Sequence, residues 1–76
     1  MIPWVASATH IKDYILQLCF NDGAKGYIDL SSELEGEIFE PLKDINYFKN
    51  FKITGHTVAW DNGADFAPEF LREEIV

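Results

Sequence analysis

The most regular alternation of apolar and polar positions lies in the stretch DYILQLCF, residues 13–20. Tyr14, Leu16, Leu18 and Phe20 fall on one side of an extended chain. A period of two residues is typical of a β-strand with one face buried. We therefore predict a strand here, with these four side chains facing the core.

The following residues, NDGAKGYIDL, predict a hairpin to a further strand. A two-residue loop at Asp22 and Gly23 would pair core-facing positions with solvent-facing ones. A three-residue loop, residues 21–23, closed by a glycine in the left-handed region, instead pairs Leu16 with Ile28. We predict the three-residue loop and this register.

The residues before this hairpin, PWVASAT at positions 3–9, predict a first strand antiparallel to the strand at 13–20. Trp4 and Val5 are consecutive, so their side chains point to opposite faces of that strand. The pattern leaves open which of the two is buried. The first half of the chain thus predicts an antiparallel three-stranded meander.

The middle of the chain predicts short helices. Ile38, Phe39 and Leu42 are spaced for burial in a turn or short helix. Asp44 precedes INYFKN and is a residue type that accepts a hydrogen bond from the first turn of a helix. We expect two short helical segments between the two β-hairpins.

A second hairpin and a terminal helix complete the pattern. FKIT and TVAW flank Gly55 and His56, and a two-residue loop there pairs Ile53 with Val58. Glycine at the first loop position is typical of a type II′ turn. Pro68 suits the first position of a helix over PEFLREEIV, and Phe66 is placed to pack on Leu71 across its start.

Length and composition fit one α+β domain spanning residues 1–76. The chain is 47% apolar and 25% charged, which is ordinary for a globular fold, and contains no repeat or linker-like tract. A domain of this size is near the lower limit for burying a core without disulfides or metal, so self-association as a homodimer stays open. The α+β class follows from three strands, short helices, a hairpin and a helix in that order.

Charge and targeting signals exclude several function classes. Thirteen acidic against six basic residues give a net charge of -7, which repels phosphate backbones, so we expect no direct nucleic-acid binding. The N-terminus lacks the basic region and apolar core of a signal peptide, and no apolar run reaches the roughly 20 residues that span a bilayer. We expect a cytoplasmic protein with no membrane partner.

The acidic stretch DNGADFAPE, residues 61–69, is the first candidate for chemistry. A calcium loop of the EF-hand kind needs oxygen ligands at alternate positions before its glycine, and this stretch lacks them. The alternative is structural: Asn62 and Gly63 turn the chain, while Asp65 and Glu69 favour the positive end of the next helix. We adopt the structural interpretation and expect no metal.

The remaining polar residues offer no catalytic constellation. The run of Glu33, Glu35, Glu37 and Glu40 is interpreted as a solvated acidic edge, because paired catalytic carboxylates need a cleft. His10 and His56 lie in predicted turns without ligand-spaced partners. No nucleophile motif contains Cys19, Ser7, Ser31 or Ser32. Cys19 is the only cysteine, which excludes an internal disulfide and a four-cysteine zinc site. We predict no catalytic residue and no cofactor.

Binding residues are predicted on the non-core face of the first hairpin. Ile15, Cys19 and Tyr27 fall there among polar neighbours, and such a mixed face can contact a partner protein or a second copy. Ile15 and Tyr27, together with Trp4, are our candidate binding residues. An alternative is a pocket for a small ligand walled by Trp4, Trp60 and Tyr27.

The order of these motifs resembles a small bacterial family, domain of unknown function 2442. The resemblance covers nearly the whole chain. It is carried by a strand ending in Phe before a D-G turn, then "DLS", then "F.PL.D...F" and a closing "W.NGAD..PE.L". In this chain the motif positions are Phe20, Asp22, Gly23, Asp29, Leu30, Ser31, Phe39, Pro41, Leu42, Asp44, Phe48, Trp60, Asn62, Gly63, Ala64, Asp65, Pro68, Glu69 and Leu71. Ile45 departs from the pattern, because a proline often follows the Asp there.

The resemblance implies a compact α+β domain and no established catalytic residues. It also implies two kinds of role. Some relatives carry a helix-turn-helix segment after this domain, which the present sequence lacks, and some are similar to small acidic partners of another small protein, as in toxin and antitoxin pairs. We therefore expect a small acidic protein-interaction module, similar to the antitoxin-like partner of another small protein. The alternative is a regulatory or small-ligand-sensing domain, related to those attached to helix-turn-helix regulators.

Overall fold

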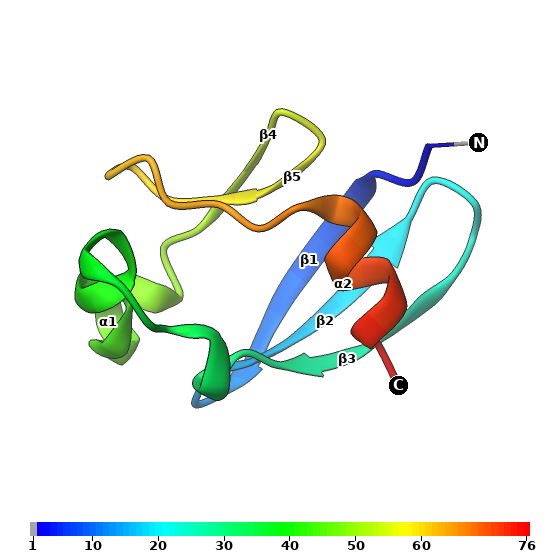
Figure 1. Ribbon diagram of the computed structural model, residues 1–76. Coiled ribbons are helices and arrows are strands. Elements are labelled where there is room, and N and C mark those ends of the chain that lie inside the picture. The colour runs from blue at the N-terminus through cyan, green and yellow to red at the C-terminus, as the bar shows by residue number, and fades with distance from the viewer. Residues whose placement is uncertain (1) are drawn as a thin grey trace.

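A computed structural model describes residues 2–76, and Figure 1 shows a three-stranded sheet beside a smaller two-stranded one, with helices between and after them. The three-stranded sheet is antiparallel in the order β1-β2-β3, and β4 pairs with β5. The elements are β1 (Val5–Lys12), β2 (Ile15–Phe20), β3 (Lys25–Asp29), the 3-10 helices η1 (Ser31–Glu33) and η2 (Glu37–Lys43), α1 (Ile45–Phe48), β4 (Lys52–Thr54), β5 (Thr57–Ala59) and α2 (Pro68–Glu74). The predicted α+β class, with a meander, a second hairpin and a C-terminal helix, is confirmed.

The predicted register of the first hairpin is confirmed. Leu16 pairs with Ile28. The N–H of Phe20 donates to the Ala24 carbonyl at 2.8 Å, so the loop that this bond closes has three residues, 21–23. Gly23 closes it in the left-handed region, with φ of 87°. The register keeps the alternate residues of β2 on the core side, where Leu16 and Leu18 are fully buried. Hydrophobic alternation decided this pairing, because a shift of one residue would expose the whole apolar set.

Two loops of the chain, at residues 20–24 and 60–64, have the same pattern of hydrogen bonds. In the stretch from Phe20 to Ala24, the N–H of Phe20 donates to the carbonyl of Ala24, and the N–H of Gly23 donates to the carbonyl of Phe20. The Asp22 carboxylate accepts from the N–H of Ala24. The stretch from Trp60 to Ala64 repeats all three bonds, with Asn62 in the place of Asp22. The acidic stretch after Trp60 is therefore a turn, as predicted.

The second hairpin has the predicted pairing of Ile53 with Val58, but its turn type differs from our prediction. Gly55 and His56 both have positive φ, 59° and 69°, which makes a type I′ turn and not a type II′ turn. Two contacts hold His56 in this conformation. Its carbonyl accepts the N–H of Val5 at 2.9 Å, and its ring stacks on Trp4 with centroids 4.8 Å apart.

The short helices form where predicted, with one error in burial. Asp44 caps α1, since its carboxylate accepts the N–H of Asn46 at 2.9 Å. Leu42 is fully buried, and Phe39 is half-buried. Ile38 was predicted to be buried but is 46% exposed. The 3-10 helix η2 turns its side chains by a third of a circle per residue, so Ile38 and its neighbour Phe39 cannot both face inward.

The core joins both sheets and α2 into one cluster. Phe48 and Trp60 lie at its centre, and the indole N–H of Trp60 donates to the Phe48 carbonyl at 2.8 Å. Helix α2 lies over the inner face of the three-stranded sheet in Figure 1, where Leu71 is fully buried. The buried apolar residues are Val5, Leu16, Leu18, Phe20, Ile28, Leu30, Leu34, Leu42, Phe48, Val58, Trp60, Ala64, Phe66 and Leu71.

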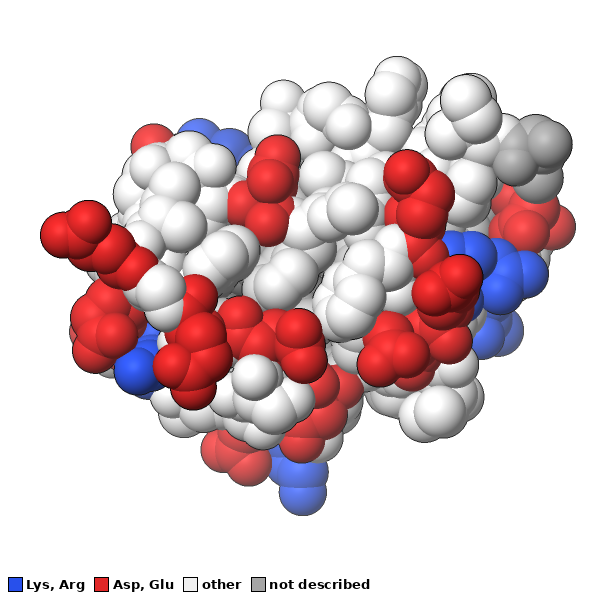
Figure 2. All heavy atoms as spheres, viewed as in Figure 1, with Lys and Arg blue, Asp and Glu red and all other residues white. Residues whose placement is uncertain are grey.

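Charged side chains are unevenly distributed over the surface. In Figure 2, which has the viewpoint of Figure 1, acidic groups lie across the face that carries α2, and basic groups lie at its margins. The residues in this structure form three ion pairs, which join Lys43 to Glu40, Lys52 to Asp61 and Arg72 to Asp22. Most carboxylates on this face therefore have no cationic neighbour within ion-pair distance.

The chain after α2 covers the outer edge of β3. The N–H and C=O of Tyr27 each pair with Val76, both at 3.0 Å. Gly26 provides the space for this contact, because a Cβ there would lie 2.7 Å from the carbonyl oxygen of Val76 and 3.1 Å from the Cβ of Ile75. Edge strands present unpaired backbone groups, and residues 75–76 satisfy those of Tyr27.

We expect Gly26→Ala to lower the free energy of unfolding by about 1 kcal/mol in urea denaturation. Ala normally gains about 0.5–1 kcal/mol over Gly inside a strand. Here its methyl group displaces Val76, and loss of two hydrogen bonds at about 0.5–1.5 kcal/mol each outweighs that gain. Hydrogen exchange at the Tyr27 amide is expected to accelerate.

The matched control for this prediction is the same substitution in a chain shortened after Glu74. Ile75 and Val76 supply the three atoms closest to the new methyl group, so without them Gly26→Ala is expected to become neutral or stabilising. A full-length Gly26→Ala protein as stable as the native one would contradict the role of Gly26.

Candidate functional site

Ile15 and Tyr27, two of the predicted binding residues, lie on the outer face of the three-stranded sheet. Tyr27 pairs with Gln17, so Ile15 is its diagonal neighbour on that face. Tyr27 is 46% exposed and Ile15 is half-buried. Gln17 adjoins both residues on this face, and Cys19 follows it along β2. The structure thus brings these two predicted residues together.

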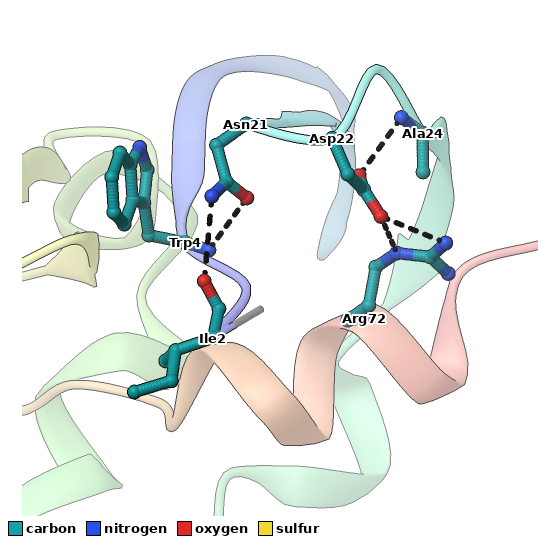
Figure 3. Close-up of polar contacts among 6 residues, drawn as sticks. All are labelled: Ile2, Trp4, Asn21, Asp22, Ala24 and Arg72. Atoms are coloured by element: carbon teal, nitrogen blue, oxygen red, sulfur yellow. Dashed lines mark hydrogen bonds and ion pairs between the residues drawn. The ribbon is translucent and has the colours of Figure 1, made fainter.

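Trp4, the third predicted binding residue, lies elsewhere. It is 42% exposed, and the side chain of Asn21 holds its backbone by accepting the Trp4 N–H at 3.0 Å and donating to the carbonyl of Ile2 (Figure 3). Asn21 follows the end of β2, whereas Ile15 begins that strand. Trp4 therefore belongs to a different part of the surface from Ile15 and Tyr27.

Trp60, which the ligand-sensing alternative used as a pocket wall, is only 4% exposed and packs between Phe48 and Phe66. Its indole N–H is already bonded to a backbone carbonyl. Within residues 2–76 the chain encloses no pocket. Trp60 acts as a core residue.

The other polar candidates are dispersed. His10 lies in strand β1 and not in a turn as predicted, and its Nε2 donates to the Asp13 carbonyl at 2.8 Å. Cys19 is a half-buried free thiol in β2. Asp61 pairs with Lys52 at 3.2 Å. Among residues 2–76, no three His, Cys, Asp or Glu side chains are grouped in a way that would hold a metal ion. None of the helices in that part of the chain is long and apolar enough to cross a membrane.

The loop between β2 and β3 connects three parts of the fold. Asn21 holds the N-terminal segment, and Asp22 accepts the N–H of Ala24 and both Nε and a terminal nitrogen of Arg72, each at 3.2 Å (Figure 3). The bond from Ala24 lowers the pKa of the Asp22 carboxyl, and the Arg72 guanidinium acts in the same direction. This loop therefore positions α2 against the sheet.

We expect the stability contribution of Asp22 to depend on pH. Because folding lowers the pKa of its carboxyl, the contribution is present above the unfolded-state value of about 3.9 and is lost as the pH falls through the folded-state value. Asp22→Asn should be less stable than the native chain near neutral pH. The difference should close in acid, and urea denaturation across the pH range measures it. A constant difference down to pH of about 2 would contradict this assignment.

A row of three phenylalanines on the opposite side from Ile15 and Tyr27 was not identified from the sequence. The rings of Phe39 and Phe66 stack with centroids 5.1 Å apart, and those of Phe66 and Phe70 with centroids 6.2 Å apart. We call Phe39, Phe66 and Phe70 the aromatic row. Phe39 and Phe70 are half-buried, and the exposed Ile38 precedes Phe39 in η2.

Three different elements position the aromatic row. Phe39 comes from η2, Phe70 from α2, and Phe66 from the segment before α2. The backbone at Phe66 is fixed, because its carbonyl accepts the buried hydroxyl of Thr57 at 2.6 Å. The side chain of Asn62 donates to the Ile38 carbonyl at 2.8 Å and joins η2 to the loop after Trp60. The row is thus built on contacts between segments distant in sequence.

Carboxylates lie next to every member of the aromatic row. Each of them adjoins a row residue in sequence or lies within about one helical turn of one, and all are exposed. We call them the acidic rim: Glu37, Glu40, Asp65, Glu69 and Glu73. Among the residues of the structure only Glu40 of this rim forms an ion pair, with Lys43. Figure 2 shows uncharged surface between acidic groups on this face.

A partial sequence signal for the row existed. Phe66 and Phe70 are four residues apart around a helix start, a spacing at which side chains meet. The predicted packing of Phe66 across the helix start is compatible with the structure, since Phe66 and Leu71 share one buried cluster. Phe39 is distant in sequence, so only the tertiary structure brings it to Phe66.

Comparison with known proteins identifies one family. The sequence model of a family described as "Protein of unknown function (DUF2442)" matches residues 5–76, which is nearly the whole chain. No curated protein and no solved structure matches the chain. The resemblance noted from the sequence motifs is confirmed.

Proposed function

The chain belongs to the DUF2442 family of proteins of unknown function, and we propose that it is a small acidic interaction module that binds another protein through the aromatic row and acidic rim. The observation that carries the proposal is a stack of three phenylalanines, the outer two half-buried, among carboxylates of which only Glu40 forms an ion pair in this structure. Aromatic residues, phenylalanine among them, are enriched at protein interfaces, where a few anchor residues carry most of the binding energy.

The charge of the chain supports a partner of opposite sign. A net charge of -7 on 76 residues produces a field that speeds encounter with cationic surfaces. The same field opposes nucleic acids and anionic membranes, so a protein partner is favoured. Acidic groups and apolar rings on one face provide both long-range attraction and short-range burial.

Purification of the chain from cells tests this function. A tagged copy expressed at its natural level is expected to retain a second protein, identified by mass spectrometry. Phe70→Ala is expected to reduce its recovery at least several-fold, and Tyr27→Ala is the matched control on the outer sheet face. Recovery of this chain alone, or loss of the partner only with Tyr27→Ala, would contradict the proposal.

A further inference from the structure

The aromatic row presents its two outer rings, Phe39 and Phe70, at the surface, while the middle ring, Phe66, is 8% exposed and belongs to the core. Ile38 at one end is 46% exposed, and the outer parts of Phe39 and Phe70 are accessible. The two gaps between ring centroids are 5.1 Å and 6.2 Å. The centroids of the outer rings, Phe39 and Phe70, therefore lie within about two turns of an α-helix, which rises 5.4 Å per turn. A helix of two to three turns spans the row.

The charges around the row indicate which residue types should border the apolar stripe of such a helix. Glu69 and Glu73 lie beside Phe70 on α2, and Asp65 precedes Phe66. None of these three carboxylates lies within ion-pair distance of a Lys or Arg of residues 2–76. A helix seated on the row therefore gains most if lysines or arginines border its apolar stripe.

A second copy of the chain is a poorer occupant. Two molecules of charge -7 that met through this face would bring their acidic rims together, and like charges across an interface cost free energy. An added β-strand also fits poorly, because the row runs across helical and irregular segments and offers no open strand edge.

We propose that the aromatic row and acidic rim form a docking surface for a cationic amphipathic helix of a partner protein. The proposal rests on the function proposed above and specifies the partner's chemistry. Apolar side chains at positions i, i+4 and i+7 of the helix lie against the accessible parts of Ile38, Phe39 and Phe70. Lysines or arginines on either side of that stripe lie against Glu69, Glu73 and the other rim carboxylates.

Binding of designed peptides to the full chain tests the proposal. The probe is a helix-forming peptide of about four turns with leucines on one face and lysines on the other. A scrambled peptide of the same composition lacks the stripe, and a third peptide carries glutamates in place of lysines. Calorimetry is expected to give the amphipathic lysine peptide at least about tenfold higher affinity than the scrambled one, decreasing with salt, and no binding of the glutamate peptide.

Variants of the chain locate the binding site. Phe70→Ala is expected to weaken binding about tenfold, as loss of a central aromatic anchor does. The double variant Glu69→Gln with Glu73→Gln keeps the shape of the surface and should flatten the salt dependence. Ile53→Ala, at a 41% exposed position of β4 outside the row and the rim, should leave the affinity unchanged. Circular dichroism checks that each variant is folded, and the exposed glutamate variant keeps the test decisive if Phe70→Ala unfolds.

Several outcomes would overturn the inference. They are equal binding of the scrambled peptide, unchanged affinity of both row and rim variants, and amide shift changes at Ile15 and Tyr27 without changes at Phe66 and Phe70. If no peptide binds but a cellular partner is still lost with Phe70→Ala, the interaction function stands and the helical cationic partner is wrong. If no partner is recovered either, the proposed function itself fails.

Discussion

Phe48→Ala is expected to lower the free energy of unfolding by about 3–5 kcal/mol, which is a large part of the stability of so small a domain. Phe48 is fully buried, and its ring contacts Tyr14 and Trp60 with centroids 5.2 Å and 5.6 Å away. Truncating a buried Phe costs about 3–5 kcal/mol. At about 0.05–0.15 kcal/mol per residue, a domain of this length has only about 4–11 kcal/mol in total.

Tyr47→Ala is the matched control for Phe48→Ala, because Tyr47 precedes Phe48 in the same helix and is only half-buried. Its cost should be clearly smaller. Urea denaturation followed by tryptophan fluorescence measures both variants, since Trp60 is adjacent to Phe48. A fully folded Phe48→Ala protein with a cost similar to that of Tyr47→Ala would show that the core is not centred on this ring.

Thr57→Val is expected to lower the free energy of unfolding by about 1–3 kcal/mol. Thr57 is 4% exposed, and its hydroxyl donates to the Phe66 carbonyl at 2.6 Å. Valine has nearly the same shape but leaves that buried carbonyl without its partner, and an unsatisfied buried acceptor costs about this much. Because Phe66 is the middle ring of the aromatic row, NMR signals of Phe39 and Phe70 should also shift.

Thr54→Val is the matched control for Thr57→Val. Thr54 is the cross-strand partner of Thr57 in the same hairpin, and it is exposed. The identical chemical change there should alter stability by less than about 0.5 kcal/mol, as is usual for surface substitutions. Equal effects at both positions in urea denaturation would mean that the hydroxyl of Thr57 does not hold Phe66.

Phe48 and Thr57, the buried residues changed in these two predictions, connect the core to the proposed docking surface. Phe48 packs on Trp60, Trp60 lies edge-on to Phe66, and Phe66 stacks on both outer rings of the aromatic row. The same aromatic cluster therefore stabilises the fold and presents its outer members to a partner. Substitutions at Phe70 test the surface with less risk to the fold than substitutions at Phe66, because Phe70 is only half-buried.

Much of the fold was predictable from local patterns. The period of two in β2 decided which residues face the core, and that choice also decided the three-residue loop before β3. Asp44 and Pro68 marked helix starts through chemistry that acts within a few residues. The acidic stretch after Trp60 was correctly interpreted as a turn, because Asn62 and Gly63 bond to their immediate neighbours.

The errors arose where distant contacts decide the conformation. His56 adopts a positive φ because Val5 and Trp4 hold it, so a turn type inferred from Gly55 alone was wrong. Ile38 was predicted to be buried on apolarity alone, but the inward positions of η2 are taken by Phe39 and Leu42. Neither outcome is encoded in the neighbouring residues.

The sequence by itself determined the family, the strand register and the acidic charge, because each depends on residue identity and short-range spacing. Only the tertiary structure shows that Trp4 lies apart from Ile15 and Tyr27, that Val76 pairs with the edge of β3, and that Phe39 stacks on Phe66. Those arrangements join segments far apart along the chain. They follow from how one small core is packed, which no local pattern specifies.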